Sequence, residues 1–154
     1  MKLGDMIRKE AIRLDLEASD KWEAIEEAVN LLVANHDLKI SDRDRILNSV
    51  VEREKSMSTG IGKGVGIPHA TCDKLGHVLS VYARLKNPID FESIDGQPVQ
   101  HIVLMLIPKD QYQQHIKTLA GIARIMNNPE AREGLNQAAS PEEILDVIQQ
   151  AETV

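Results

Sequence analysis

The fold is decided by one apolar stretch, Ile102-Val103-Leu104-Met105-Leu106-Ile107. A continuous apolar run of this length predicts a central β-strand that is covered on both faces. Upstream, Leu79-Ser80-Val81-Tyr82-Ala83-Arg84-Leu85 alternates apolar and polar side chains, which predicts a second strand ending at Asn87-Pro88. Two shorter strands are expected at residues 11–16 and 65–68. Strands therefore dominate the middle of the chain.

Helical patterns flank these strands on both sides. The expected helices span about residues 20–35, 41–53, 110–126, 129–136 and 140–151. Three of them begin with a capping pattern, in which a short polar side chain precedes an acidic residue by three positions: Asp20 with Glu23, Ser41 with Asp44, and Ser140 with Glu143. Within the first of these helices, Trp22 is the first of several apolar residues at helical spacing, and we expect it in the core.

Helices at both ends and strands in the middle predict an α/β fold in which helices pack on a sheet. We expect residues 1–154 to form a single layered domain. The connections are too short for every strand pair to be joined by a parallel crossover. The sequence therefore predicts a mixed β-sheet flanked by helices.

Composition limits the functional classes. The 18 Lys and Arg against 24 Asp and Glu give a net charge of −6, which argues against nucleic-acid binding through a basic surface. The longest apolar run is far below the roughly 20 residues that a membrane helix needs, and residues 1–5 do not resemble a secretory signal. The single cysteine, Cys72, cannot form an internal disulfide. We expect a cytoplasmic protein that is peripheral to a membrane at most.

The segment Gly60-Ile61-Gly62-Lys63-Gly64-Val65-Gly66 holds four of the nine glycines. Alternating glycines can expose backbone amides that cradle an anion, or they can form a tight, bulged turn into a buried strand. Pro68 and His69 follow directly. A histidine held stiffly beside exposed amides is suited to nucleophilic attack on phosphorus, because its imidazole is largely neutral near pH 7.

Other candidate residues are weaker. His36, His77 and His101 lack the spacing of metal ligands, so no metal site is expected. Cys72 lies three residues after His69, where it either packs as a small apolar side chain or senses oxidation.

Seven segments of the chain together form a specific pattern. They are Arg53-Glu54, Ser58-Thr59-Gly60-Ile61-Gly62, Gly64-Val65-Gly66-Ile67-Pro68-His69-Ala70, Pro88-Ile89-Asp90-Phe91, Ile94-Asp95-Gly96-Gln97-Pro98-Val99, Leu106-Ile107-Pro108 and His115-Ile116-Lys117-Thr118-Leu119-Ala120. The pattern resembles the fructose/mannitol/nitrogen-regulatory class of enzyme IIA, a component of the bacterial phosphoenolpyruvate-dependent phosphotransferase system. The resemblance covers about residues 5–150, and one departure is Gly66, where the family usually has alanine.

The resemblance implies that His69 carries a phosphoryl group as tele-phosphohistidine. Arg53 would hold the phosphoryl oxygens with its guanidinium fork, and His115 would donate a hydrogen bond to them. The loop residues Thr59, Gly60, Gly62 and Gly64 would support the phosphate, although the Thr59 hydroxyl could equally bond its own loop. No cofactor or metal is implied, because such transfer needs in-line geometry and charge stabilisation.

The resemblance also implies the partners. The donor would be HPr or an HPr-like phosphocarrier, and nothing in the chain suggests a fused domain, which favours a free-standing nitrogen-regulatory type. One alternative is a fructose- or mannitol-type transport component that passes the phosphoryl group to a IIB domain. Another is a regulatory binding module that docks on an enzyme or transporter without onward transfer.

Overall fold

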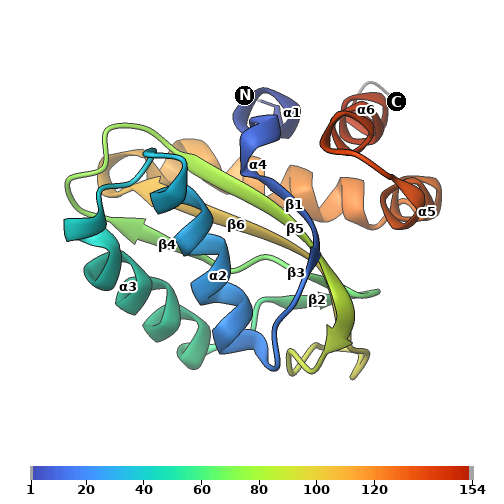
Figure 1. Cartoon of the computed structure of the whole chain (residues 1–154), viewed down its shortest axis with the longest axis horizontal. Coiled ribbons are helices and arrows are strands. Elements are labelled where there is room, and N and C mark those ends of the chain that lie inside the picture. Colours follow the sequence, from blue (N-terminus) through green and yellow to red (C-terminus); the bar gives the residue numbers. More distant parts are fainter. Residues whose placement is uncertain (1, 153–154) are drawn as a thin grey trace.

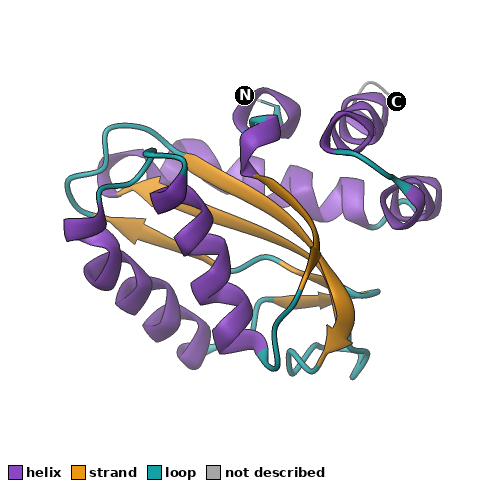
Figure 2. Ribbon diagram, viewed as in Figure 1, coloured by secondary structure: helices purple, strands orange, loops and turns teal. Residues whose placement is uncertain are grey.

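The computed structural model describes residues 2–152, which form a mixed sheet between two layers of helices (Figures 1 and 2). The helices are α1 (Leu3–Met6), α2 (Lys21–Ala34), α3 (Arg43–Ser56), α4 (Tyr112–Met126), α5 (Pro129–Gln137) and α6 (Pro141–Glu152). The strands are β1 (Ile12–Leu16), β2 (Gly60–Gly62), β3 (Val65–Gly66), β4 (His69–Cys72), β5 (Leu79–Ile89) and β6 (Val99–Pro108). Short 3₁₀ turns, η1 (Lys9–Ala11), η2 (Ile40–Asp42) and η3 (Lys109–Gln111), precede β1, α3 and α4.

The sheet has the strand order β1-β5-β6-β3-β2, and β4 also pairs with β6. β5 and β6 are antiparallel, whereas β1 is parallel to β5 and both β3 and β4 are parallel to β6. The prediction of a mixed sheet is therefore confirmed. Two short strands thus share one edge of β6: β3 pairs at His101 and Ile102, and β4 pairs from Met105 to Pro108.

The central strand β6 is buried on both faces, as its apolar run predicts. Leu104 and Leu106 pack with α2 and α3 in one core cluster. Val103, Met105 and Ile107 pack on the opposite side with α1, α4, α5 and α6. Figure 1 shows these two helical layers, with α2 and α3 on one side of the sheet and α4 on the other. Trp22 packs at the border of the first cluster and is only partly buried.

Two of the three capping predictions are confirmed. The Asp20 side chain accepts a hydrogen bond from the Glu23 amide at the start of α2, and Ser140 Oγ accepts one from the Glu143 amide at the start of α6. The third is wrong, because α3 begins only at Arg43 and the 3₁₀ turn η2 leads the chain into it.

The predicted end of β5 at Asn87-Pro88 is also wrong, since the strand continues to Ile89. Proline has no amide hydrogen to donate to a ladder. It is tolerated here because the β1 pairing stops at Leu85 and the β6 register shifts between Arg84 and Ile89, so residues 86–88 lie exposed on an edge.

No helix among residues 2–152 has both the length and the apolar character needed to cross a membrane.

Candidate functional site

His69 is the first residue of β4, the short edge strand that extends the sheet beyond β6. The Pro68 carbonyl accepts a hydrogen bond from the Met105 amide, which anchors the backbone just before the histidine. Ala70 and Cys72 point into the core beneath α2 and α3. Because side chains alternate along a strand, His69 points to the opposite face, which α4 covers.

A backbone carbonyl determines the tautomer of this imidazole. His69 Nδ1 lies 2.9 Å from the Ile67 carbonyl oxygen. A carbonyl only accepts hydrogen bonds, so Nδ1 carries the proton and the lone pair of the neutral ring is on Nε2. Burial lowers the pKa of His69; the Ile67 carbonyl opposes that shift, and the Arg53 charge adds to it. The ring is therefore neutral near pH 7 with Nε2 available as a nucleophile.

His69 opens into a pocket of about 440 Å³ at this edge of the sheet. Helix α3 forms one wall, and η3 with the start of α4 forms the other. The lining residues are Ser49, Arg53, His69, Ala70, Thr71, Lys109 and Tyr112. Sequence reasoning missed Ser49, Lys109 and Tyr112. No local pattern marked these three residues, because their approach to His69 depends on the pairing of β4 with β6.

The structure brings Arg53 to the same pocket as His69. Arg53 is in the last turn of α3, and its Nη1 donates a hydrogen bond to the Met57 carbonyl at 3.0 Å. A guanidinium has five N–H donors in a planar fork. Since this hydrogen bond goes to a neutral carbonyl, the positive charge of Arg53 is available to an anion in the pocket.

His115 lies in the first turns of α4, three residues after Tyr112, and it is buried. Burial lowers its pKa, and its Nδ1 is 3.5 Å from the Thr118 hydroxyl. His115 is not among the residues that line the pocket. It does belong to the helix that covers the face on which His69 points. A contact between His115 and a phosphoryl group on His69 stays a prediction.

The glycine run forms a tight hairpin. Of the two alternatives for this run, an anion-binding loop and a tight turn, the structure shows the turn. Lys63 and Gly64 both have positive φ, as a two-residue hairpin turn between β2 and β3 requires. The Lys63 amide donates to Asp95 Oδ2 at 2.8 Å, and the Gly64 carbonyl accepts from the His101 amide. His69 pairs four residues further along β6, which places the turn about 13 Å away along the strand.

Thr59, Gly60, Gly62 and Gly64 accordingly do not line the His69 pocket. The Thr59 hydroxyl donates to Glu54 Oε1 in helix α3 at 2.6 Å, and not to its own loop. Gly66, the departure from the family pattern, has its own explanation. A Cβ there would lie 2.9 Å from Cε2 of the buried Phe91 ring.

Cys72 is buried beneath α2 and α3, and burial raises the pKa of its thiol. The thiolate is the reactive form of cysteine. The packing alternative therefore fits Cys72 better than redox sensing does.

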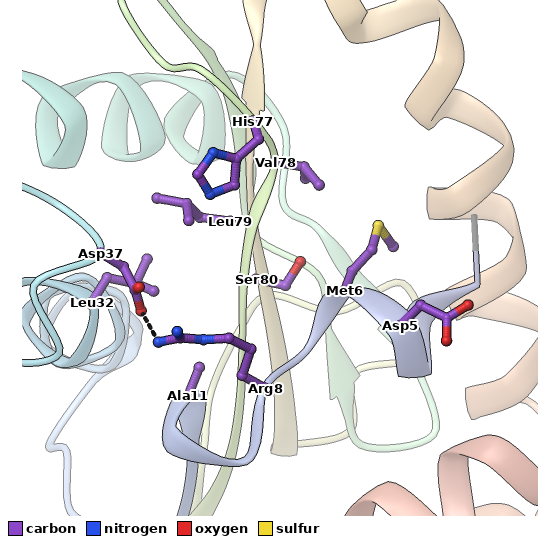
Figure 3. A pocket seen from close by; sticks show the side chains of 10 residues that line it. All are labelled: Asp5, Met6, Arg8, Ala11, Leu32, Asp37, His77, Val78, Leu79 and Ser80. Carbon is purple, nitrogen blue, oxygen red and sulfur yellow. Dashed lines mark hydrogen bonds and ion pairs between the residues drawn. The ribbon is translucent and has the colours of Figure 1, made fainter.

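A second hollow of about 290 Å³ lies where β5 begins, opposite the end of α2 (Figure 3). Figure 3 shows His77 above an ion pair between Arg8 and Asp37. Arg8 Nη2 is 2.7 Å from Asp37 Oδ2, so its charge is already neutralised. The His69 pocket differs because its arginine forms no ion pair with a carboxylate among residues 2–152.

The family model described as "Phosphoenolpyruvate-dependent sugar phosphotransferase system, EIIA 2" matches residues 5–151. The chain belongs to this enzyme IIA family. It is similar to a nitrogen regulatory protein of Bradyrhizobium diazoefficiens, with 34% identity over 148 residues that cover 96% of this chain and 95% of the relative. The fold is that of nitrogen regulatory protein IIA-Ntr from Neisseria meningitidis, with a TM-score of 0.86, 30% identity, and coverage of 95% of this chain and 98% of that one.

Enzyme IIA relatives also occur as parts of longer proteins. The fructose-specific EIIABC component of Bacillus subtilis is 31% identical over 150 residues, which are 97% of this chain. The chain spans only 23% of the length of that relative. This chain is thus a phosphotransfer component of the phosphotransferase system, and both nitrogen-regulatory and sugar-transport proteins are among its relatives.

Proposed function

We propose that His69 accepts a phosphoryl group on Nε2 from the phosphohistidine of an HPr-type carrier. The observation that carries this proposal is the bond from His69 Nδ1 to the Ile67 carbonyl, which leaves the Nε2 lone pair for attack. In the transfer, the bond between phosphorus and the donor's histidine nitrogen breaks as the bond to Nε2 forms in line with it. No proton moves from His69 in this step, because Nδ1 already holds it and the product is a cationic ring bearing the phosphoryl dianion.

The transferring group is anionic, and the pocket offers cations for it. Arg53 and Lys109 both line the pocket. Lys109 Nζ lies 3.7 Å from Asp73 Oδ1 in an exposed ion pair, so Arg53 is the main cation for the phosphoryl group. A guanidinium can donate hydrogen bonds to two phosphoryl oxygens at once. His115 would donate a further hydrogen bond to the phosphoryl oxygens, as the family resemblance implies. Positioned donors of this kind stabilise the charge that spreads over the oxygens in the transition state.

The carrier would dock on apolar side chains around the pocket. Tyr112 lines the pocket and is 39% exposed, and Ile116, one turn further along α4, is 42% exposed. Met57, whose carbonyl holds Arg53, is 71% exposed. A transient transfer complex needs only a small interface, of about 1,200 Å² or less. An acceptor IIB domain would use the same surface, because it too must reach His69.

The nitrogen-regulatory type is our preferred assignment, and a cytoplasmic location goes with it. It is supported by the match to the Bradyrhizobium diazoefficiens protein over nearly the full length of both chains and by the fold of the Neisseria meningitidis protein. The alternative is a sugar-transport component, which the Bacillus subtilis fructose relative supports. Incubation of the phosphorylated protein with a panel of IIB domains separates them, since onward transfer to a IIB domain is expected only of the transport type.

The test of the proposal is phosphorylation by a purified, phosphorylated HPr-type carrier. We expect one acid-labile, base-stable phosphoryl group on the wild-type protein and none on His69→Ala. The matched control is His77→Ala, which removes an exposed histidine from the other hollow and should be labelled like the wild type. Labelling of His69→Ala would refute the assignment. If no carrier phosphorylates the wild-type protein, the remaining alternative is a binding module that transfers no phosphoryl group.

A further inference from the structure

An ion pair is buried between the start of α2 and the end of α3. Lys21, in the first turn of α2, places Nζ 3.2 Å from Glu54 Oε2 in the last turn of α3. The two side chains are only 5% and 0% exposed. Lys21 also donates to the Phe91 carbonyl at 3.3 Å and lies 5.0 Å from the centre of the Phe91 ring. Removing two charges from water is costly, and a buried pair often stabilises a protein no more than apolar residues would.

Both carboxylate oxygens of Glu54 accept hydrogen bonds from Thr59. Its Oε2 accepts from the Thr59 amide at 2.8 Å, and its Oε1 accepts from the Thr59 hydroxyl at 2.6 Å. The Thr59 carbonyl in turn accepts from the Ile67 amide at 3.1 Å. The Ile67 carbonyl then accepts from His69 Nδ1. An unbroken chain of contacts therefore connects α2 to the imidazole through Glu54.

We propose that Glu54 is a positioning residue for phosphoryl transfer at His69, because its buried carboxylate clamps Thr59 and thereby fixes the Ile67 carbonyl that orients the imidazole. Lys21 supplies the counter-charge that lets this carboxylate stay ionised in the interior. The inference rests on the proposed function of His69. Glu54 itself does not touch the phosphoryl group, since it does not line the pocket.

Glu54 also acts on His69 through its charge. Arg53 from α3 and Lys109 from η3 line the pocket with His69, whereas the Glu54 carboxylate at the end of α3 acts on the ring from outside the pocket. Arg53 lowers the pKa of His69, whereas Glu54 raises it. The carboxylate therefore offsets part of the effect of the arginine. A purely structural carboxylate, distant from the ring, would leave the imidazole titration unchanged.

The first experiment reads the imidazole itself, by ¹⁵N NMR titration of His69 in the unphosphorylated protein. We expect the wild type to hold the Nδ1–H tautomer. Glu54→Gln should lower the pKa of His69 further and populate the Nε2–H tautomer. Glu52→Gln is the matched control, because it removes the same charge from an exposed position on the same helix and should leave both readouts unchanged.

Glu54→Gln removes the buried partner of Lys21, leaves it only the exposed Glu92 carboxylate at 3.5 Å, and could fail to fold. A second pair of variants therefore keeps the ion pair between Lys21 and Glu54. Thr59→Val removes the hydroxyl that holds Glu54 Oε1, whereas Thr59→Ser retains it. We expect Thr59→Val to show the Nε2–H tautomer and Thr59→Ser to restore the wild-type spectrum. The folded state of each variant is checked by circular dichroism.

The second experiment measures transfer from the phosphorylated carrier in rapid-quench time courses. We expect Thr59→Val, and Glu54→Gln if folded, to lower the rate at saturating carrier by about 10- to 100-fold, because small misplacements of a reacting group have effects of that size. The half-saturating carrier concentration should change less than about twofold. Wild-type tautomer, pKa and rate in folded Thr59→Val would overturn the inference. If the wild type itself accepts no phosphoryl group, the proposed function fails, while the tautomer readout still tests the role of Glu54.

Discussion

Gly66→Ala introduces the residue that is usual in the family and is nevertheless expected to destabilise this protein. The new Cβ would lie 2.9, 3.1 and 3.2 Å from three carbons of the Phe91 ring, where ordinary contacts are 3.4–4 Å. Phe91 is fully buried, so its ring has to move by about 0.5 Å against packed neighbours. Its carbonyl also accepts hydrogen bonds from Lys21 and from the Ser58 hydroxyl, which restrict that movement.

The expected loss follows from this geometry. Overpacking of a core typically costs about 1–3 kcal/mol. Replacing glycine with alanine stabilises by about 0.4–1 kcal/mol, because it restricts the unfolded chain. The middle of these two ranges gives a net loss of about 1.3 kcal/mol. For a chain of about 150 residues, each kcal/mol shifts Tm by about 2–4 °C. Gly66→Ala should therefore lower Tm by about 3–5 °C.

Thermal and urea unfolding, followed by circular dichroism, measure the change. The control is Gly76→Ala, whose Cβ would have no neighbour within 4 Å and which should be neutral or slightly stabilising. A double-mutant cycle with Phe91→Leu identifies the partner, because a smaller side chain at position 91 should remove the penalty of Gly66→Ala. The reasoning is refuted if Gly66→Ala is as stable as Gly76→Ala, or if the two changes in the cycle are additive.

Three further outcomes are expected. His115→Ala should slow phosphoryl acceptance by His69 about 10²- to 10³-fold if His115 donates to the phosphoryl oxygens; a rapid-quench rate within twofold of wild type would remove it from the site. Burial lowers the pKa values of His69, His101 and His115 below the usual 6.5. As pH falls through that value, the unfolded chain therefore binds more protons than the folded protein does. The free energy of unfolding should thus be constant above about pH 6.5 and decrease below it. Urea titrations at pH 7.5 and 5.5 measure this difference, which should be smaller in His101→Gln than in the wild type. Chemical-shift mapping with the carrier should perturb Met57 and residues around 69–71 and 109–116, and changes confined to residues 1–36 would contradict the docking surface.

Patterns that are local in the sequence predicted most of the elements. The apolar run at 102–107 identified the buried central strand, and the helical periodicities on either side identified the layers that cover it. Capping at Asp20 and Ser140 was correct because it depends on side chains within three residues of a helix start. The same locality explains the error at Pro88, whose tolerance depends on where a distant strand stops pairing.

The candidate site divides in the same way. His69 was identified as a candidate nucleophile from the proline and glycines that precede it, and the family was identified from the surrounding motif. Each of these patterns is contiguous in the chain. Only the tertiary structure placed β4 against β6, which sets Lys109 and Tyr112 beside Arg53 and His69. It also moved the glycine turn away from the histidine and buried Glu54 against Lys21, 33 residues earlier in the chain. Such pairings form between segments that are far apart in sequence, and their energy depends on burial and register that no local pattern encodes.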